Sequence, residues 1–518
     1  MARAALPQFI AEVVDDRRAL RALVASTIAL VAAGLNPQVL SPFIVDIQAA
    51  IRAQPELLAL STLASVLGAG MLLVGGVAAD VYRTRRILEW ALAALVAMSA
   101  VGIFVTAGPL FLASRLGGAM AAGFVIPFAI AAVATVYAGT ARATAIGVAY
   151  AGFGLGAALP PILLTITGPG GSDLPAYLAS VVAALVALRV SRAVPDLPGV
   201  SGLRALAVGR VALWAFGVIA LSAGLAAVGS GTHPVRLALV FAGIGILGIA
   251  SLLEWRARAG GAQIEISLRP VTVVLAAGLF IGFAQAVPMT LLPAFFQVIL
   301  GFGPVFAVAA LAPIFAALVV AGPVAGWLLP RSSPRTLIGG GLVAVGIGDL
   351  LLAFVAGRGV SYLLFILPFV LVGAGFVIAT TVRTAVIFAS VPRDLPASAA
   401  ALNEASVGLG SRVGIAVASV LLAEATLAAY ASTVPAGVDA SDALATLRDL
   451  VIAIGTPALL TQIEGADPSL LTGYADAYVE GIRLVHLATG TLAVIAGLIA
   501  VVAIGRRDPL EGMWEHRH

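Results

Sequence analysis

Several ionisable side chains lie inside long apolar stretches of this sequence, where a charged group requires an explanation. The acids are Glu404 and Asp349, and the bases include Arg115, Arg383 and Arg412. If these stretches cross a bilayer, a charge near its centre costs about 3 kcal/mol even on forgiving scales, so each residue is a functional candidate by default. Carboxyl groups can take up and release protons, which makes Glu404 and Asp349 candidate proton-coupling residues.

Each of these residues also has a structural interpretation. Glu404 could form a permanent ion pair with Arg412, two helical turns further along the chain. Asp349 could face a water-filled vestibule, and Arg115 could extend its side chain to the outer surface. Arg383 and Arg412 could pair with carboxylates or contact an anionic substrate.

The sequence offers little for metal or nucleophilic chemistry. It has no cysteine and only four histidines, and it contains no Gly-x-Ser-x-Gly, His-Glu-x-x-His or Walker sequence. Arg483 and His486 fit an interfacial position, where the histidine could sense pH. We therefore expect a protein that is not an enzyme, with no catalytic residues, no metal and no cofactor.

The elements that position these residues follow from composition. Of the 518 residues 61% are hydrophobic and 10% are charged, which is too few charges for a surface facing water on all sides. A helix needs about 20 apolar residues to cross a bilayer. Fourteen segments fit, at about 23–45, 57–79, 87–105, 112–137, 145–167, 177–188, 211–228, 237–253, 271–300, 305–329, 337–355, 363–389, 397–423 and 481–504. The expected fold class is an all-α integral membrane protein with fourteen transmembrane helices.

Arginine placement tests this assignment independently, because cytoplasmic loops are enriched in basic residues. All 29 basic residues are arginine; 20 fall in loops on one side, four in loops on the other and five within spans. Both termini are then cytoplasmic, and we expect a multi-pass protein of the plasma membrane. We expect this membrane to be the inner membrane of a bacterium. The formal charge of +4 reflects this topology and does not indicate nucleic-acid binding.

A short sequence recurs in the second span of each block of six spans. One copy runs from Gly76 through Asp80 to Arg85 and the other from Gly326 to Arg335, with nine residues from glycine to arginine in each. Repeated halves are typical of secondary transporters. The predicted domains are an N-terminal six-helix bundle over 1–200, two linker helices over 201–262, and a C-terminal six-helix bundle over 263–518 with an external loop at about 425–478. An apolar run in that loop, 450–460, is expected to lie on the outer leaflet.

The stretch from Gly76 to Arg86 resembles the helix 2 to 3 loop signature of the major facilitator superfamily, and fourteen spans resemble its drug:proton antiporter branch. Three further stretches are similar to that branch, in its helix 4, its ninth and tenth helices and its thirteenth helix: 115–127, 292–304 and 401–414. The resemblance implies two six-helix pseudo-symmetric bundles joined by two linker helices. It also implies that Arg115 influences proton transfer by holding a neighbouring carboxylate ionised or releasing it.

The resemblance further implies a cytoplasmic gate formed by Asp80, Arg83, Arg85 and Arg86. Asp80 would pair with arginines across the gate in one conformation and lose them in the other, which would bias a two-state equilibrium. The alternative is a solvated loop whose positive charge serves only the topology.

Two departures from the family bear on mechanism. The family's helix 1 carries Leu-Asp-x-Thr-Ile-Val-Asn, whereas this sequence has Asn36 at the aspartate position, and asparagine cannot carry a proton. The helix 5 antiporter signature is replaced by a stretch that contains Pro160 and Pro161. If transport is proton-driven, the carrier must therefore lie elsewhere.

A substrate pathway is expected between the two halves near the midplane. The candidates are amide and aromatic residues of the spans, together with one arginine: Asn36, Gln38, Gln285, Phe295, Phe296, Gln297, Asn403 and Arg412. Such a lining suits hydrophobic compounds that are neutral or weakly cationic. The amides could instead join helix to helix by hydrogen bonds.

We therefore expect a secondary active transporter that exports a small hydrophobic or amphipathic, drug-like compound by alternating access, coupled to proton antiport. The alternatives are a proton-independent uniporter, a lipid or metabolite exporter and, in another class, a non-transporting membrane receptor or regulator with this fold. The expected partners are the substrate, protons and membrane lipids, and the chain is expected to be a monomer.

Overall fold

The computed structural model describes the chain over 13–14, 16–38, 67–68, 70–78, 80, 82, 84–104, 109–167, 174–194, 196, 204–228, 234–259, 268–390, 396–432 and 468–504. Within these ranges the chain is almost wholly helical and contains no strand. Eleven of the described helices are long and apolar enough to cross a membrane by length and composition. The predicted all-α membrane fold is confirmed.

The described helices follow the predicted spans in order. The first half contains α2 (Arg17–Gln38), α5 (Thr84–Phe104), α6 (Pro109–Val136), α7 (Gly139–Thr167) and α8 (Leu174–Val190). Its second span is helical at 67–68, 70–78 and 80. Two linker helices follow, α9 (Arg204–Val228) and α10 (Pro234–Ala259). The second half contains α11 (Leu268–Val298), α12 (Pro304–Ala309), α13 (Ala312–Leu328), α14 (Pro334–Val355), α15 (Leu363–Ser390), α16 (Pro396–Ala431) and α19 (Pro468–Ala503).

Proline sets the start of many of these helices. The first helical position needs no N–H donor and already has the φ angle of proline, so a proline there costs nothing. α14, for example, begins at Pro334, directly after Ser333, whose hydroxyl accepts a hydrogen bond from the Thr336 N–H. A proline also begins α6, α10, α12, α16 and α19.

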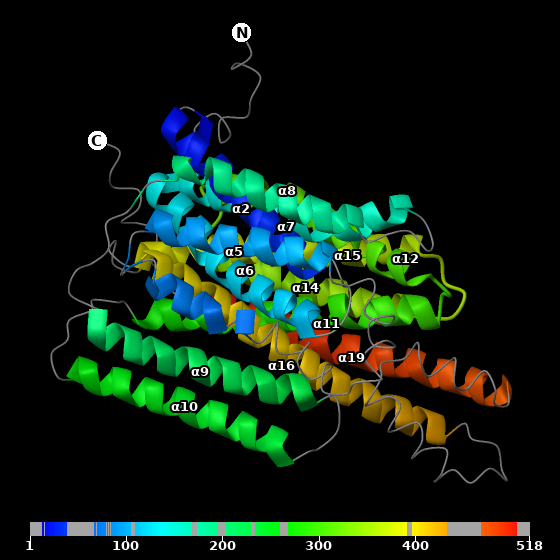
Figure 1. Ribbon diagram of the computed structural model, residues 1–518. Helices are drawn as coiled ribbons and strands as arrows, with labels where there is room; N and C mark the ends of the chain where they lie inside the picture. The colour runs from blue at the N-terminus through cyan, green and yellow to red at the C-terminus, as the bar shows by residue number, and fades with distance from the viewer. Residues whose placement is uncertain are drawn as a thin grey trace.

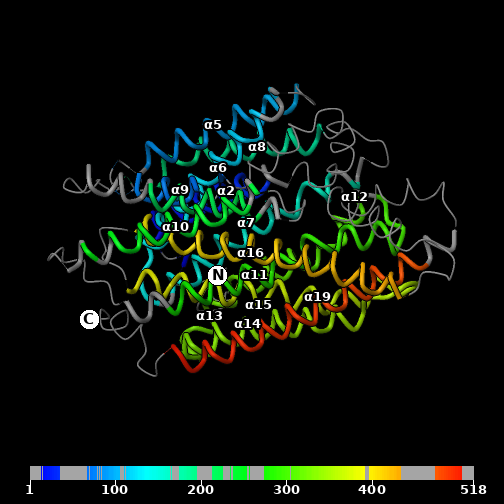
Figure 2. Tube along the Cα trace, turned by 90° about the horizontal axis from the view of Figure 1, so that it is seen from below, coloured from blue at the N-terminus to red at the C-terminus, as the bar shows by residue number. Residues whose placement is uncertain are grey.

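The two halves lie side by side in the bundle. Figure 2 shows α5 and α8 at one edge and α14 and α19 at the opposite edge. Between these edges α7 of the first half packs along α13 of the second, and α6 packs against α16. The residues at these two seams are the ones that can contact both halves.

Glycines at the seams repeat the internal symmetry of the sequence. A methyl group on Gly76 would collide with Ala397 and Ala401 of α16, whereas one on Gly326 would collide with Thr144 of α7. Each copy of the repeated sequence therefore brings a glycine against a helix of the opposite half. This supports the six-plus-six arrangement that the repeat predicts; the domain boundaries themselves stay a prediction.

The linker helices form an antiparallel pair along one side of the bundle, next to α16 (Figure 1). Ala215 and Val218 of α9 pack in one apolar cluster with Leu73 of the second span and with Ala401 and Ala405 of α16. The pair therefore covers the seam at which the second span meets α16.

The predicted external loop is partly helical. α16 continues to Ala431 and α19 begins at Pro468, so both helices extend into the stretch at 425–478 that was expected to be loop. The extensions are stabilised by an aromatic stack in which the Tyr474 ring lies 6.4 Å from the ring of Tyr430 and 6.2 Å from that of Tyr478. The apolar run 450–460 lies outside the described residues.

Candidate functional site

Glu404 lies in a polar network that joins the two halves. Its carboxylate accepts hydrogen bonds from the Tyr150 hydroxyl of α7 and from the Asn403 amide of α16, the latter at 3.1 Å. The same amide donates to Thr384 Oγ1 of α15 at 2.8 Å, and Thr384 Oγ1 lies 3.1 Å from the Tyr150 hydroxyl. Three helices thus converge on one carboxyl group within the membrane-spanning part of the chain.

The arginine that acts on Glu404 is Arg383. Its side chain is 0% exposed, and its guanidinium donates to Ser406 Oγ at 2.7 Å and to the Asn403 carbonyl at 3.3 Å. The guanidinium contributes a positive charge near Glu404, although the two side chains form no direct ion pair in the described part of the chain. Gly278 of α11 leaves the space for Arg383, because a methyl group there would collide with Nη1.

The ion pair between Glu404 and Arg412, one of the alternatives raised by the sequence, is not formed. Arg412 Nη1 donates to the Gly408 carbonyl of its own helix at 2.8 Å, whereas Glu404 contacts Tyr150 and Asn403. The two-turn spacing places both residues on α16 but does not bring their charged groups together.

The other two proton-coupling candidates lie apart from Glu404. Asp349 on α14 is fully buried and hydrogen-bonds with His486 of α19, which is also fully buried, so Asp349 does not face the water-filled vestibule suggested by the sequence. Arg115 is partly buried on α6, and the group that interacts with its charge is Tyr177 of α8, in the same half.

The gate candidate Asp80 contacts the opposite half, but through a different partner from the one predicted. Its carboxylate accepts hydrogen bonds from the backbone N–H groups of Ala397 at 2.9 Å and Ser398 at 2.7 Å, at the start of α16. The free N–H groups and the positive dipole end of a helix attract a carboxylate, so Asp80 acts as an N-cap supplied from the other half. Burial nevertheless raises the pKa of Asp80 to about 6, and the hydrogen bonds from Ser398 and Ala397 oppose that rise.

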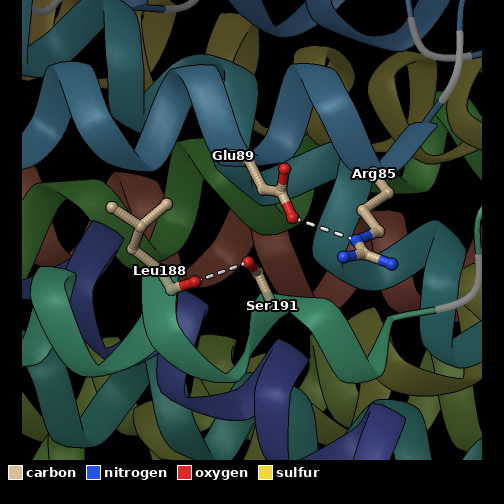
Figure 3. A network of polar contacts seen from close by, with 4 residues as sticks. All are labelled: Arg85, Glu89, Leu188 and Ser191. Carbon is tan, nitrogen blue, oxygen red and sulfur yellow. Dashed lines mark hydrogen bonds and ion pairs between the residues drawn. The ribbon is translucent and has the colours of Figure 1, made fainter.

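The arginines of the gate motif do not pair with Asp80 where they are described. Arg85 donates to Glu89, one turn along α5, at 2.9 Å (Figure 3). In the same view the Ser191 hydroxyl donates to the Leu188 carbonyl at the end of α8. Arg86 is exposed, and Arg83 lies outside the described residues.

The pathway candidates are only partly brought together. Gln285 donates to Met289 Sδ at 2.6 Å and Gln297 to the Pro293 carbonyl at 3.1 Å, so each amide bonds within α11. Phe295 and Phe296 are 0% exposed and pack with Phe365. Asn403 belongs to the network around Glu404. The side chains of Asn36 and Gln38 lie outside the described residues.

Sequence reasoning missed Tyr150, Thr384 and Ser406. A hydroxyl group in an apolar helix carries no charge and gives no signal by its spacing. Tyr150 is separated from Glu404 by 254 positions, so no local pattern connects them. The nearest signal is the glycine run of α7, where a methyl group on Gly147 would collide with the backbone of Gly322 in α13. That run marks α7 as a helix that closely approaches the other half.

Comparisons with known proteins agree with this architecture. A family model described as Major Facilitator Superfamily matches residues 26–415. Multidrug resistance protein Stp of Mycobacterium tuberculosis is 28% identical over 209 residues; the match covers 39% of this chain and spans only 38% of that relative.

Solved structures resemble the whole chain. The human organic anion transporter MFSD10 has a TM-score of 0.58 and 14% identity, covering 93% of this chain and 99% of that protein. The proton:xylose symporter XylE, bound to 6-bromo-6-deoxy-D-glucose, has a TM-score of 0.56 and 13% identity, covering 96% and 99%. At these identities the likeness concerns the fold alone.

Proposed function

Because the chain belongs to the Major Facilitator Superfamily, we propose that it is a secondary active transporter that exports a hydrophobic or amphipathic compound in exchange for protons. Glu404 is the proposed proton carrier. Alternating access would expose it first to one side of the membrane and then to the other as the two halves rock.

The observation that carries this proposal is the contact of Glu404 with Tyr150 across the two halves. A carboxyl group inside a single half would titrate without reporting the relative position of the halves. Here protonation and the inter-half contact involve the same oxygen, so each can change the other. This is the thermodynamic linkage that a coupled transporter requires.

Counting hydrogens suggests how protonation would change the contact. Thr384 Oγ1 already donates to the Thr380 carbonyl at 2.7 Å. With Glu404 ionised, the hydrogen of Tyr150 is used on the carboxylate, which leaves the contact between Tyr150 and Thr384 without a hydrogen. With Glu404 protonated, the acid can donate to Tyr150, and Tyr150 can donate to Thr384. Protonation therefore reverses the hydrogen bond between Glu404 and Tyr150 and completes a short hydroxyl chain that continues to Thr384.

The substrate class is proposed from the comparison with a relative and from the resemblance of the spans. The relative named a multidrug resistance protein aligns with part of the chain, and the resemblance of the fourteen spans points to the drug:proton antiporter branch. Export across the plasma membrane is proposed on the same grounds. A lipophilic cation bound between the halves would have Glu404 as its counter-ion when that carboxyl group is ionised.

The test is efflux of a fluorescent lipophilic cation from proteoliposomes under an imposed pH gradient. We expect the wild type to respond to the gradient, and Glu404→Gln to lose the response while it retains passive exchange. Glu424→Gln is the matched control, because Glu424 lies on the same helix but is exposed.

The outcomes separate the alternatives. Wild-type flux that ignores the gradient would contradict antiport and favour a uniporter. If Glu404→Gln and Glu424→Gln lose the response to the pH gradient equally, Glu404 is not the specific proton carrier. No flux of any lipophilic probe would contradict the proposed substrate class.

A further inference from the structure

α14 and α19 hold a buried pair of titratable side chains away from Glu404. Asp349 Oδ1 and His486 Nδ1 are 3.0 Å apart, and both side chains are 0% exposed. The remaining polar atoms of the pair, Asp349 Oδ2 and His486 Nε2, have no hydrogen-bond partner in the described part of the chain. Two titratable groups therefore share a single hydrogen bond.

The two helices are held together closely beside this pair. A methyl group on Gly339 would lie 2.7 Å from the Gly497 carbonyl, and one on Gly346 would lie 2.7 Å from the Gly490 carbonyl. These contacts run antiparallel along α14 and α19, and Asp349 and His486 come about one turn later on the same seam. The backbone contact leaves little freedom for the helices to separate and admit water.

The surroundings of the pair on the neighbouring helices are apolar. One cluster at this seam contains Ala284 of α11, Val345 of α14, Val372 of α15 and Ala493 of α19. On α16, Leu422 and Thr426 approach α19 near Gly481, while the carboxylate of that segment, Glu424, is exposed.

The charged groups of α19 nearest to the pair are Arg483 and Glu480. They lie three and six residues before His486, and they bond to each other at 2.8 Å with side chains 39% and 60% exposed. Arg483 also donates to the Ala356 carbonyl at the end of α14 at 2.8 Å. Exposed charged groups therefore lie on α19 within two turns of the buried histidine.

The net charge of the pair decides which protonation state fits. If His486 is neutral with its hydrogen on Nδ1, Asp349 is an anion with one hydrogen bond, and the buried net charge is −1. One more proton makes the pair neutral overall, either as a carboxylate with an imidazolium or as an acid with a neutral imidazole. His486 Nε2 carries a hydrogen in the imidazolium form and in the acid form whose hydrogen is donated to Nδ1, whereas an acid protonated on Oδ2 would leave Nδ1–H donating to Oδ1 and Nε2 bare.

We propose that Asp349 and His486 together form a second proton-binding site, which holds one proton and is separate from Glu404. Its ligand is a proton, which would enter from the side of the pair on which Arg483 and Glu480 lie. This goes beyond the proposed transport cycle, because the site is defined by its own two residues and does not depend on the identity of the substrate.

The test uses the full chain in lipid, labelled with ¹⁵N-histidine. The chain has four histidines, and replacing the other three (His233→Gln, His516→Gln and His518→Gln) leaves one imidazole to observe by solid-state NMR. We expect Nε2 of His486 to carry hydrogen at pH 7.5. If the triple variant does not fold, the wild-type spectrum minus that of His486→Gln gives the same signal.

Three results would overturn the proposal. A bare Nε2 with hydrogen on Nδ1 at pH 7.5, together with a ¹³C carboxyl signal of Asp349 typical of the ionised form, would show that the pair lacks the extra proton. An unchanged Nδ1 signal in Asp349→Asn would show that the two side chains are not in contact. A changed His486 signal in Glu404→Gln would show that the two sites are not separate. The transport test can fail while all three results favour the second site, so the two proposals are judged independently.

Discussion

Tyr150 is the residue through which Glu404 contacts the opposite half. Its hydroxyl is also within 3.1 Å of Thr384 Oγ1, so it has two possible directions in which to donate its hydrogen. A phenol serves this purpose well because its O–H can rotate, whereas its ring is held by packing. The chemistry at this position therefore depends on a single oxygen atom.

At the residue scale, we expect Tyr150→Phe to uncouple proton entry from the inter-half contact. The change leaves the carboxylate with Asn403 as its remaining donor in the network, at a cost of about 1 to 3 kcal/mol for a buried polar group that loses its partner. A loss of 1.4 kcal/mol corresponds to about tenfold in rate. Gradient-driven efflux should fall by about that factor, while exchange without a gradient persists.

The matched control for this change is Tyr82→Phe. It also removes a tyrosine hydroxyl, but from an exposed residue outside the network. The measurement is the rate of gradient-driven efflux from proteoliposomes of the two variants, prepared in parallel. If Tyr150→Phe and Tyr82→Phe retain the same gradient-driven rate, the hydroxyl chain plays no part in coupling.

At the element scale, helices of opposite halves approach until backbone meets backbone. Gly147 of α7 and Gly322 of α13 face each other, and Gly326 faces Thr144. Membrane helices gain little from the hydrophobic effect against lipid, so they associate by close van der Waals packing of small residues. These glycines therefore set the distance between α7 and α13, and with it the position of Tyr150.

Enlarging one seam glycine should stop transport while leaving the individual helices intact. In Gly147→Ala, the added methyl group collides with the Gly322 backbone, so α7 must shift and carry Tyr150 away from Glu404. Gly340→Ala on α14 is the control, since nothing lies within 4 Å of the new methyl group there. We expect a lower melting temperature and loss of efflux only in Gly147→Ala; equal behaviour of the two variants would contradict this.

At the scale of the whole molecule, the fold was predictable because its signals are local. Apolar length and arginine placement each concern neighbouring residues, and the described helices confirm the order of the spans. Asn403 and Glu404 were also visible, as polar residues within an apolar helix. The partners of Glu404 were not, because Tyr150 lies 254 positions away and only the packing of the halves brings it near. The helical extension around Tyr430 and Tyr474 was missed for the same reason.

Asp80 gives a prediction about the conformation of the whole molecule. In the described state its pKa is raised to about 6, whereas a solvated aspartate has a value near 3.8. The state in which Asp80 is buried against α16 thus binds the proton more tightly. Lowering the pH from 7 through 6 to 4 should favour contact between the halves at this end, and Asp80→Asn should remove this part of the pH dependence.

The absence of cysteine from the sequence makes the measurement direct. Spin labels on Arg86→Cys and Thr336→Cys report the separation of the two halves, because Arg86 lies in the first turn of α5 in the first half, Thr336 lies in the first turn of α14 in the second half, and both are exposed. On acidification, the distribution of distances between the two spin labels should shift toward its short-distance population. An identical pH response in Asp80→Asn would assign the effect to another group.

The glycine seam has one more consequence, which concerns motion. Interdigitated side chains resist the sliding of one helix past another, because they must change rotamer at each step. The facing glycines of α7 and α13 have no side chains, so the two surfaces can tilt against each other there with little friction. The seam between α7 and α13 would therefore be the pivot of the proposed rocking motion. In the proposed cycle, the halves can turn only after the hydrogen bonds of Asp80 with α16 and of Glu404 with Tyr150 have broken.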